Sequence, residues 1–453
     1  MRSLQRRPYF IFSILVLAVI VPKPRGADKS PALVLAHEVE RIAGKGELWP
    51  GFDPMAIPLA MYDGERTYLF RHPAPPEGFR LDARTRPIAY VFAGRHPAIT
   101  ANTSTDLGGI RTATVMLPPP DAGRSMANLA AVAIHEAFHV FQRKRHPAWQ
   151  ANEADLFAYP LDDAGLLTLR RVESEALRRA LESASACWAR RAMDVRTERF
   201  ARMDSASVAY EHGTELYEGL ANYIQGLAGD APIDLAAGGF TAFDVRLRAY
   251  ATGRAMAVLL DRFRLGWQSS LEANDRQSLD EMLRKALPAV TEASNCALSA
   301  AKADAIERSA RDDVKHLADE RFRARASFDK LPGRRIEVVA ADGRPLWPQG
   351  FDPLNVDRVA GGLLHTRYVR IGNERGYVEA LDDETADITA LTEGVGPHPL
   401  FNGVRRVVIV VPSDSVVIES DGRVKVTAPG MGLSFEHASV RKSGGDVIVA
   451  LDR

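Results

Sequence analysis

The sequence predicts an α+β protein in which a small sheet precedes a long helical half, and a β-rich domain follows at the C-terminus. Three changes of composition along the chain indicate this order. Short apolar or β-branched runs separated by Pro and Gly occupy residues 67–117. Ala, Leu, Arg and Glu then recur with helical spacing from about 125 to 326. After Pro332, Val- and Ile-rich runs alternate with Asp-Gly and Gly-Gly turns. We therefore expect segments 28–120, 121–326 and 327–453 to form these three parts.

The individual elements follow from periodicity and from the positions of Gly and Pro. A short helix over residues 30–43 ends where glycines and prolines follow. A longer helix begins near Ser125 and ends before Pro147. The expected strands of the first part are 67–70, 87–92 and 111–117; the later helices are 166–193, 207–226, 243–263, 278–287 and 297–324; the C-terminal strands are 336–339, 363–371, 404–411, 416–419, 424–426 and 447–449.

The helix near Ser125 carries the sequence His-Glu-Ala-Phe-His at 135–139. Residues four apart lie about 40° from one another around a helix axis, so His135 and His139 can present both imidazoles to one metal ion. Glu136 then lies beside the ion, where a carboxylate can take a proton from a water without being a ligand. With 11 His and 58 acidic residues in 453, about 0.03 chance matches to this pattern are expected. The motif therefore predicts a Zn²⁺ site.

A catalytic zinc ion needs three protein ligands and one open position. Residues 215–221, Glu-Leu-Tyr-Glu-Gly-Leu-Ala, offer Glu218 as the third ligand. Here the chain resembles the gluzincins, the zinc peptidases whose third ligand is a glutamate on a later helix, and Glu218-Gly-Leu-Ala is similar to the form found in their aminopeptidase branch. The resemblance covers two helices and the strand before them, and it implies a zincin-like catalytic domain. Gly219 and Ala221 are small enough to let this helix approach the His-bearing helix closely.

Five other acids compete with Glu218 for the role of third ligand. They are Glu215, Glu173, Glu175, Asp162 and Asp163. The first lies one turn before Glu218, the two other glutamates lie on an Arg-rich helix typical of a solvated or salt-bridged face, and the aspartates follow Tyr-Pro in a loop-like stretch. Glu218 lies 79 positions after His139. If it is the ligand, the helical insertion over residues 156–203 has to fold out and return.

A hydrolytic site also needs a donor for the developing oxyanion. Tyr223, Tyr210 and His212 lie within or beside the helix of Glu218, and we take Tyr223 as the candidate catalytic donor. A tyrosine on an amphipathic helix can equally serve packing alone. Glu211 and Glu215 are chemically suited to orienting the histidines through their distal ring nitrogens.

The strand before the His-bearing helix has its own functional interpretation. In zincins such a strand can present an exposed edge to an extended peptide, which then adds to the sheet. Residues 112–117, Thr-Ala-Thr-Val-Met-Leu, occupy that place. The alternative is an ordinary edge or core strand.

The first 27 residues predict a signal peptide. A basic start over residues 1–8 precedes an apolar run at 9–21 that is too short to span a bilayer comfortably. Arg25 precedes the small residues Gly26 and Ala27, so either the segment is removed near Ala27 or it stays as an N-terminal membrane anchor. Its removal leaves 53 basic and 58 acidic residues and a net charge of −5, which argues against a nucleic-acid partner. We expect a periplasmic or secreted protein.

Cys187 and Cys296 are the only cysteines, and no Cys-x-x-Cys spacing suggests a structural zinc site. In an oxidising compartment they can form one disulfide between two helical segments. Two buried free thiols are the alternative.

One sequence element occurs twice. Leu-Trp-Pro-Gly-Phe-Asp-Pro-Met at 48–55 recurs as Leu-Trp-Pro-Gln-Gly-Phe-Asp-Pro-Leu at 346–354. Either each copy is a tight turn in which Trp and Phe cover a small core while Asp caps the loop, or both copies line a substrate groove.

These observations predict an exported zinc metallopeptidase that acts on a peptide or protein. In this hypothesis His135, His139 and Glu218 hold the ion and Glu136 is the general base. The alternative is an envelope binding or scaffold protein with a zincin-like fold, in which the zinc site is structural or vestigial. The intact Glu136 favours the enzyme, because a structural site has no use for a general base.

Overall fold

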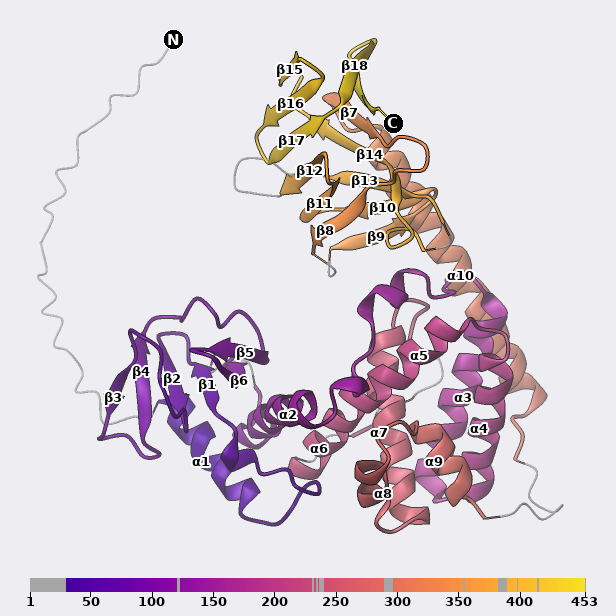
Figure 1. Ribbon diagram of the computed structural model, residues 1–453. Helices are drawn as coiled ribbons and strands as arrows, with labels where there is room; N and C mark the ends of the chain where they lie inside the picture. Colours follow the sequence, from indigo (N-terminus) through magenta and orange to yellow (C-terminus); the bar gives the residue numbers. More distant parts are fainter. Residues whose placement is uncertain are drawn as a thin grey trace, which may run out of the picture.

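The computed structural model describes residues 30–452 except 120–122, 230–231, 234, 236–239, 289–295, 353–354, 382–388, 397 and 414. The described residues form an α+β protein with a small N-terminal sheet, a helical half and a β-rich C-terminal domain (Figure 1). The expected signal segment, residues 1–27, lies outside the described residues. No helix among them combines the length and the apolar composition that crossing a membrane requires.

The N-terminal part consists of a six-stranded sheet, one α-helix and one short 3₁₀ helix. Its elements are α1 Pro31–Ala43, η1 Pro54–Ala56, β1 Leu59–Tyr62, β2 Arg66–Phe70, β3 Arg80–Asp82, β4 Ala89–Ala93, β5 Thr103–Leu107 and β6 Ile110–Met116. The strand order is β3-β4-β2-β1-β6-β5, in which β1 and β6 are parallel and the other neighbours are antiparallel. Leu35 and Val39 of α1 share one apolar core with Met61 and Val115 of the sheet. The expected helix and three expected strands are confirmed, and β1, β3 and β5 are additional.

The strand before the His-bearing helix is a core strand, so of the two alternatives for residues 112–117 the ordinary strand holds and the free edge does not. β6 is paired with β1 on one side and with β5 on the other. The reason is a tight hairpin: Gly108 and Gly109 have φ of 60° and 82°, which suits a two-residue connection. That hairpin adds β5 outside β6, and β5 is therefore the edge of the sheet.

The helical half contains the next elements, which are α2 Met126–Arg145, η2 Pro147–Trp149, η3 Glu153–Phe157, α3 Ala164–Ser183, α4 Ala186–Phe200, α5 Ser205–Thr214, η4 Glu215–Gly219, α6 Leu220–Ala228, α7 Val245–Phe263, α8 Trp267–Ala273, α9 Leu279–Ala286 and α10 Ala300–Asp329. The helix expected over 166–193 is an α3–α4 hairpin, because Ala184 adopts a left-handed conformation at φ 50° and Ser185 caps α4. The helix expected over 207–226 is interrupted by η4, a π-helical turn. Cys187 and Cys296 form a disulfide.

The C-terminal domain consists of two sheets around one apolar core. Its strands are β7 Arg334–Val339, β8 Trp347–Phe351, β9 Val356–Val359, β10 Gly362–His365, β11 Tyr368–Asn373, β12 Gly376–Leu381, β13 Ala390–Gly394, β14 Val404–Val411, β15 Val416–Ser420, β16 Arg423–Ala428, β17 Met431–Glu436, β18 Ala438–Ser443 and β19 Asp446–Leu451. One sheet has the order β18-β19-β7-β14-β13-β10-β9 and the other β15-β16-β17-β12-β11-β8. Ile336 and Ile409 of the first sheet share a core with Val378 and Leu433 of the second. The expected β-rich domain is confirmed, although residues 363–371 form two strands.

The long helix α10 leads from the helical half into the C-terminal domain (Figure 1). Further contacts connect the two parts near η3. The ring Nε2 of His398 lies 2.7 Å from the carbonyl oxygen of Ala154, and the rings of Phe157 and Phe351 are 5.7 Å apart.

The two copies of the repeated element adopt different structures. In the first copy, Trp49 and Phe52 are buried beside Phe138, and Asp53 caps η1 through a 2.8 Å hydrogen bond from the Met55 amide. This copy therefore matches the first of the two alternatives, a tight turn in which Trp and Phe cover a core. The second copy contributes strand β8, where the Trp347 side chain is 45% exposed. Its residues 353–354 lie outside the described part of the chain.

Candidate metal centre

Helix α2 holds the two histidines on a rigid element. Its N-terminus is capped by Ser125, whose hydroxyl accepts a 3.2 Å hydrogen bond from the Asn128 amide. Ile134 and Phe138 are fully buried in the core that α2 shares with α1 and the sheet. Because these residues fix the rotation of the helix, His135 and His139 face α6 and η4 together.

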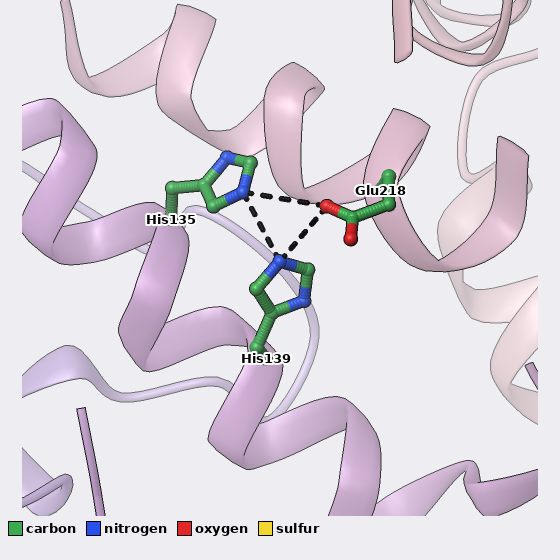
Figure 2. A group of neighbouring side chains, drawn as sticks. All are labelled: His135, His139 and Glu218. Atoms are coloured by element: carbon green, nitrogen blue, oxygen red, sulfur yellow. Dashed lines mark hydrogen bonds and ion pairs between the residues drawn. The ribbon is translucent and has the colours of Figure 1, made fainter. Parts of the chain in front are cut away.

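The structure brings the three expected ligands into one cluster (Figure 2). The Nε2 atoms of His135 and His139 are 3.1 Å apart. Oε2 of Glu218 lies 3.1 Å from Nε2 of His139 and 3.7 Å from Nε2 of His135. All three side chains are at least nine-tenths buried.

These residues fit a zinc ion. Ligands at about 2.0–2.1 Å from a tetrahedral ion lie roughly 3.3–3.4 Å from one another, and the three observed separations of 3.1, 3.1 and 3.7 Å fall around this value. Oε2 of Glu218 is buried and has no hydrogen-bond partner among the described residues. A cation between the three atoms would satisfy this oxygen and explain why two imidazole nitrogens face each other.

Gln142 fixes the protonation of His139. Its amide nitrogen donates to the carbonyl oxygens of Leu216 and Tyr217 at 3.0 and 2.9 Å, so its amide oxygen must face Nδ1 of His139, 2.9 Å away. Nδ1 therefore carries a proton, so Nε2 is the ring nitrogen that is able to bind a cation in the cluster. The same side chain ties α2 to η4. The sequence pattern did not single out Gln142, although its position one turn after His139 could have indicated a contact with that histidine.

η4 presents Glu218, and α7 supplies the groups that hold it. Oε1 of Glu218 accepts a 2.7 Å hydrogen bond from Arg246, and the carboxylate also interacts with Tyr250. Burial favours protonation of Glu218, but the two histidines and Tyr250 outweigh burial and hold its pKa well below the usual range. Its carboxylate is thus charged and its second oxygen points to the histidines. Nothing in the sequence connects Arg246 and Tyr250 with the cluster, because α7 is distant in sequence from both ligand-bearing helices.

The glycine after Glu218 packs against α7 and not, as expected, against α2. A Cβ atom on Gly219 would lie 2.7 Å from Cα of Gly253, and one on Gly253 would lie 2.7 Å from the carbonyl oxygen of Glu215. The two backbones can approach this closely only because both positions are glycine. α6 does contact α2, and Gly229 at its end lies against Ala131.

Glu136 lies next to the ligand cluster but is not part of it. Its side chain is buried and lines the same hollow as the three ligands. Burial raises the pKa of Glu136 to about 7; the charge of Glu218 adds to this shift and His135 opposes it. A carboxyl group with such a pKa can exchange its proton near neutral pH.

A buried network of arginines and glutamates lies behind η4. Its members are Glu173, Arg196, Arg199, Glu211, Glu215 and Arg248. Three positive charges balance three negative ones, and hydrogen bonds satisfy the buried carboxylates. Arg196 binds Glu215, which lies only three residues before Glu218. The network therefore fixes the turn that presents the ligand.

The network accounts for two of the five competing acids, Glu215 and Glu173, and the other three have partners elsewhere. Glu215 and Glu211 form ion pairs with arginines, so the expectation that they orient the histidines is wrong. Glu173 also pairs with an arginine and is not a ligand in the cluster. Glu175 pairs with Arg178 and Arg179 on α3. Asp163 caps α3 and Asp162 pairs with Arg321.

The structure does not bring Tyr223 to the cluster. Its hydroxyl donates to Asp261 at 3.0 Å and its ring packs against Trp267. Five residues of helix turn the chain by about 140°, which directs Tyr223 away from the side that carries Glu218. Tyr210 bonds Glu153 and His212 pairs with Asp280, so neither of these candidates is at the site.

The cluster opens into a hollow of about 330 Å³. Besides the ligands and Glu136, its walls come from the edge strand β5, from α2 and its following loop, from η4 and from α7. The other polar residues that line it are Asn102, Thr103, Ser104, Arg143, Gln150, Glu153, Tyr217, Arg246 and Tyr250. Two tyrosines lie at the cluster. The ring of Tyr217 stacks on that of His139 at 4.2 Å and its hydroxyl accepts from Arg143, whereas Tyr250 interacts with Glu218.

Comparison with known proteins gives no match to this chain, whether against protein-family models, curated proteins or solved structures.

Proposed function

We propose that this protein is a zinc-dependent peptidase with a zincin-like catalytic domain. The observation that carries the proposal is the cluster of His135, His139 and Glu218, with Glu136 beside it and the hollow in front. A zinc ion bound there would act as a Lewis acid and would lower the pKa of a water molecule.

The side chains around the cluster have separate roles in this proposal. Glu136 would hold and transfer a proton at its carboxylate, since it is next to the ligands without being one. The hydroxyl of Tyr250 and the guanidinium of Arg246 are donors in the same hollow, and they would stabilise negative charge on a carbonyl oxygen. Tyr250 takes the role that the sequence assigned to Tyr223.

The edge strand β5 would orient a peptide at this site. β5 is unpaired on its outer side within the sheet, and its residues Thr103 and Ser104 line the hollow. An extended peptide that hydrogen-bonds to this edge would pass in front of the ligand cluster. This arrangement favours a peptide or protein substrate over a small molecule.

We also propose that the protein is exported. Its basic and apolar N-terminal segment supports this, and so does the disulfide between Cys187 and Cys296, since disulfides persist mainly in oxidising compartments. Mass spectrometry of the mature chain tests the proposal: a start near residue 28 is expected. An intact Met1 in a membrane fraction would indicate an anchored protein, and an intact Met1 in the cytosol would contradict export.

Metal analysis and hydrolysis of a broad peptide library test the enzymatic proposal. We expect one zinc per chain, activity that a chelator abolishes, and loss of zinc in His139→Ala, because two ligands hold the ion poorly. Glu136→Gln should keep zinc and the fold while its rate falls by about 10²-fold or more. Protein without stoichiometric zinc, or a Glu136→Gln variant with full activity, would overturn the proposal. Zinc without any hydrolysis would instead support the envelope binding or scaffold alternative.

A further inference from the structure

A second hollow adjoins the metal centre, and its walls are strongly basic. It has a volume of about 750 Å³ and lies between the second half of α2, the residues just before β1, the residues after β2 and the β5–β6 hairpin. Four cationic side chains line it, and we call this surface the basic groove. They are Arg71, Arg111, Arg143 and Lys144.

The basic groove continues the hollow of the metal centre. Arg143 and Gln150 line both. On α2, His139 and Arg143 are one turn apart, so about 6 Å of helix separates a ligand from the first cation. β5 runs alongside, with Thr103 at the metal centre and the hairpin after Leu107 at the basic groove. A chain bound in front of the ligands therefore extends into the groove.

The four cations are not matched by acids within the groove, although Asp106 lies opposite Arg111 in the β5–β6 register. None of them forms an ion pair with a described residue, and no acidic side chain lines the groove. Nη1 of Arg71 is buried without a hydrogen-bond partner among the described residues, and its Nε donates to the Ile57 carbonyl oxygen. Glu40 and Asp53 act on its charge from outside the groove.

Unlike the cations of the basic groove, several other arginines of this chain are paired with acidic side chains. Arg246 is paired with Glu153 and Glu218, and the buried arginines behind η4 are matched by glutamates. Arg143 and Arg111, by comparison, bond only neutral oxygens, those of Tyr217 and of the Ser104 backbone. Cations that line one groove and have no acidic side chain beside them are suited to an anionic ligand.

We propose that the basic groove binds acidic side chains of the peptide substrate, a few residues to one side of the scissile bond. This inference rests on the proposed function, and it assigns that site a preference for peptides rich in Asp or Glu. Four cations on three separate elements exceed what one terminal carboxylate can engage, so several side-chain carboxylates are the better match.

Binding and cleavage of two labelled peptides that differ only in three Glu→Gln replacements test the inference. Fluorescence anisotropy with the zinc-loaded protein should give a Kd at least 10-fold lower for the Glu peptide at low salt, and the difference should shrink as ionic strength rises. The double variant Arg111→Gln/Lys144→Gln should bind both peptides equally. The matched control Lys425→Gln/Arg441→Gln removes the same charge from exposed positions of the C-terminal domain and should keep the discrimination.

Equal affinity for the two peptides, or discrimination lost equally in both double variants, would overturn the inference. Discrimination that follows amidation of the peptide C-terminus and ignores the Glu→Gln replacements would also overturn it, in favour of a terminal-carboxylate site. The binding measurement needs no hydrolysis. Absence of cleavage with intact charge discrimination therefore counts against the proposed function, and cleavage without discrimination counts against the basic groove.

Discussion

Gly219 and Gly253 approach so closely that an alanine at position 253 should disturb both the fold and the metal centre. In Gly253→Ala the new Cβ would lie 2.7 Å from the carbonyl oxygen of Glu215 and 2.8 Å from Cα of Gly219. Both are backbone atoms of η4 and cannot rotate away. Ordinary contacts are about 3.5–4.0 Å, so α7 and η4 must separate by roughly 1 Å.

Two opposing terms set the size of the effect. Overpacking of this kind costs about 1–3 kcal/mol, whereas Ala in place of Gly within a helix gains about 1 kcal/mol. We expect the free energy of unfolding to fall by up to about 2 kcal/mol. The loss of zinc should be more pronounced, because ligand distances tolerate changes of only about 0.2 Å and the separation moves Glu218. Zinc affinity should fall at least 10-fold.

Urea unfolding followed by Trp fluorescence measures the first effect, and competition with a chelator measures the second. Trp49, Trp149, Trp188 and Trp267 all lie in the N-terminal and helical parts, so the signal reports mainly on them. The control is Gly44→Ala, whose Cβ would lie no closer than 3.4 Å to any atom, and its stability should stay within about 0.5 kcal/mol of the wild type. A Gly253→Ala variant with unchanged stability and zinc affinity would refute the role of the close approach.

Three further predictions concern the surroundings of the metal centre. Gln142→Leu should lower zinc affinity by about 10–100-fold, because His139 loses the acceptor that fixes its proton; a chelator titration that matches the wild type would contradict this. Tyr250→Phe should keep zinc but lower kcat/KM by about 10²-fold, and an unchanged rate would remove Tyr250 from the site. Burial favours protonation of Glu211, but Arg199 outweighs burial and holds the pKa of Glu211 in the folded state well below the unfolded value of about 4.3. The charged carboxylate therefore stabilises the fold above about pH 4.3, and this stabilisation is lost as the pH falls below that value. Urea unfolding from pH 6 to pH 3 should show this loss, and Glu211→Gln should flatten the slope.

The sequence by itself determined which residues can bind a metal on α2 and how the three parts follow one another. Both depend on local periodicity. The separation of His135 and His139 is fixed by the helical repeat, and a helix is assured there because Ser125 caps it and Gly and Pro are absent until Pro147. The β-rich composition after Pro332 predicts a separate domain for the same reason, although a strand run such as 363–371 does not show where its turn lies.

Tertiary structure decided the rest of the site, because it depends on how distant elements pack. The sequence favoured Glu218 over Glu215 through the small residues after it, and the structure places Glu218 at the histidines for a different reason: Gly219 meets Gly253 of α7, while Arg196 holds Glu215 in a buried network. The donor in front of the cluster is Tyr250, because α7 crosses η4 there and helical rotation turns Tyr223 towards Asp261. No local pattern encodes such crossings, since the energy that fixes them comes from burial and charge pairing between segments far apart in the chain.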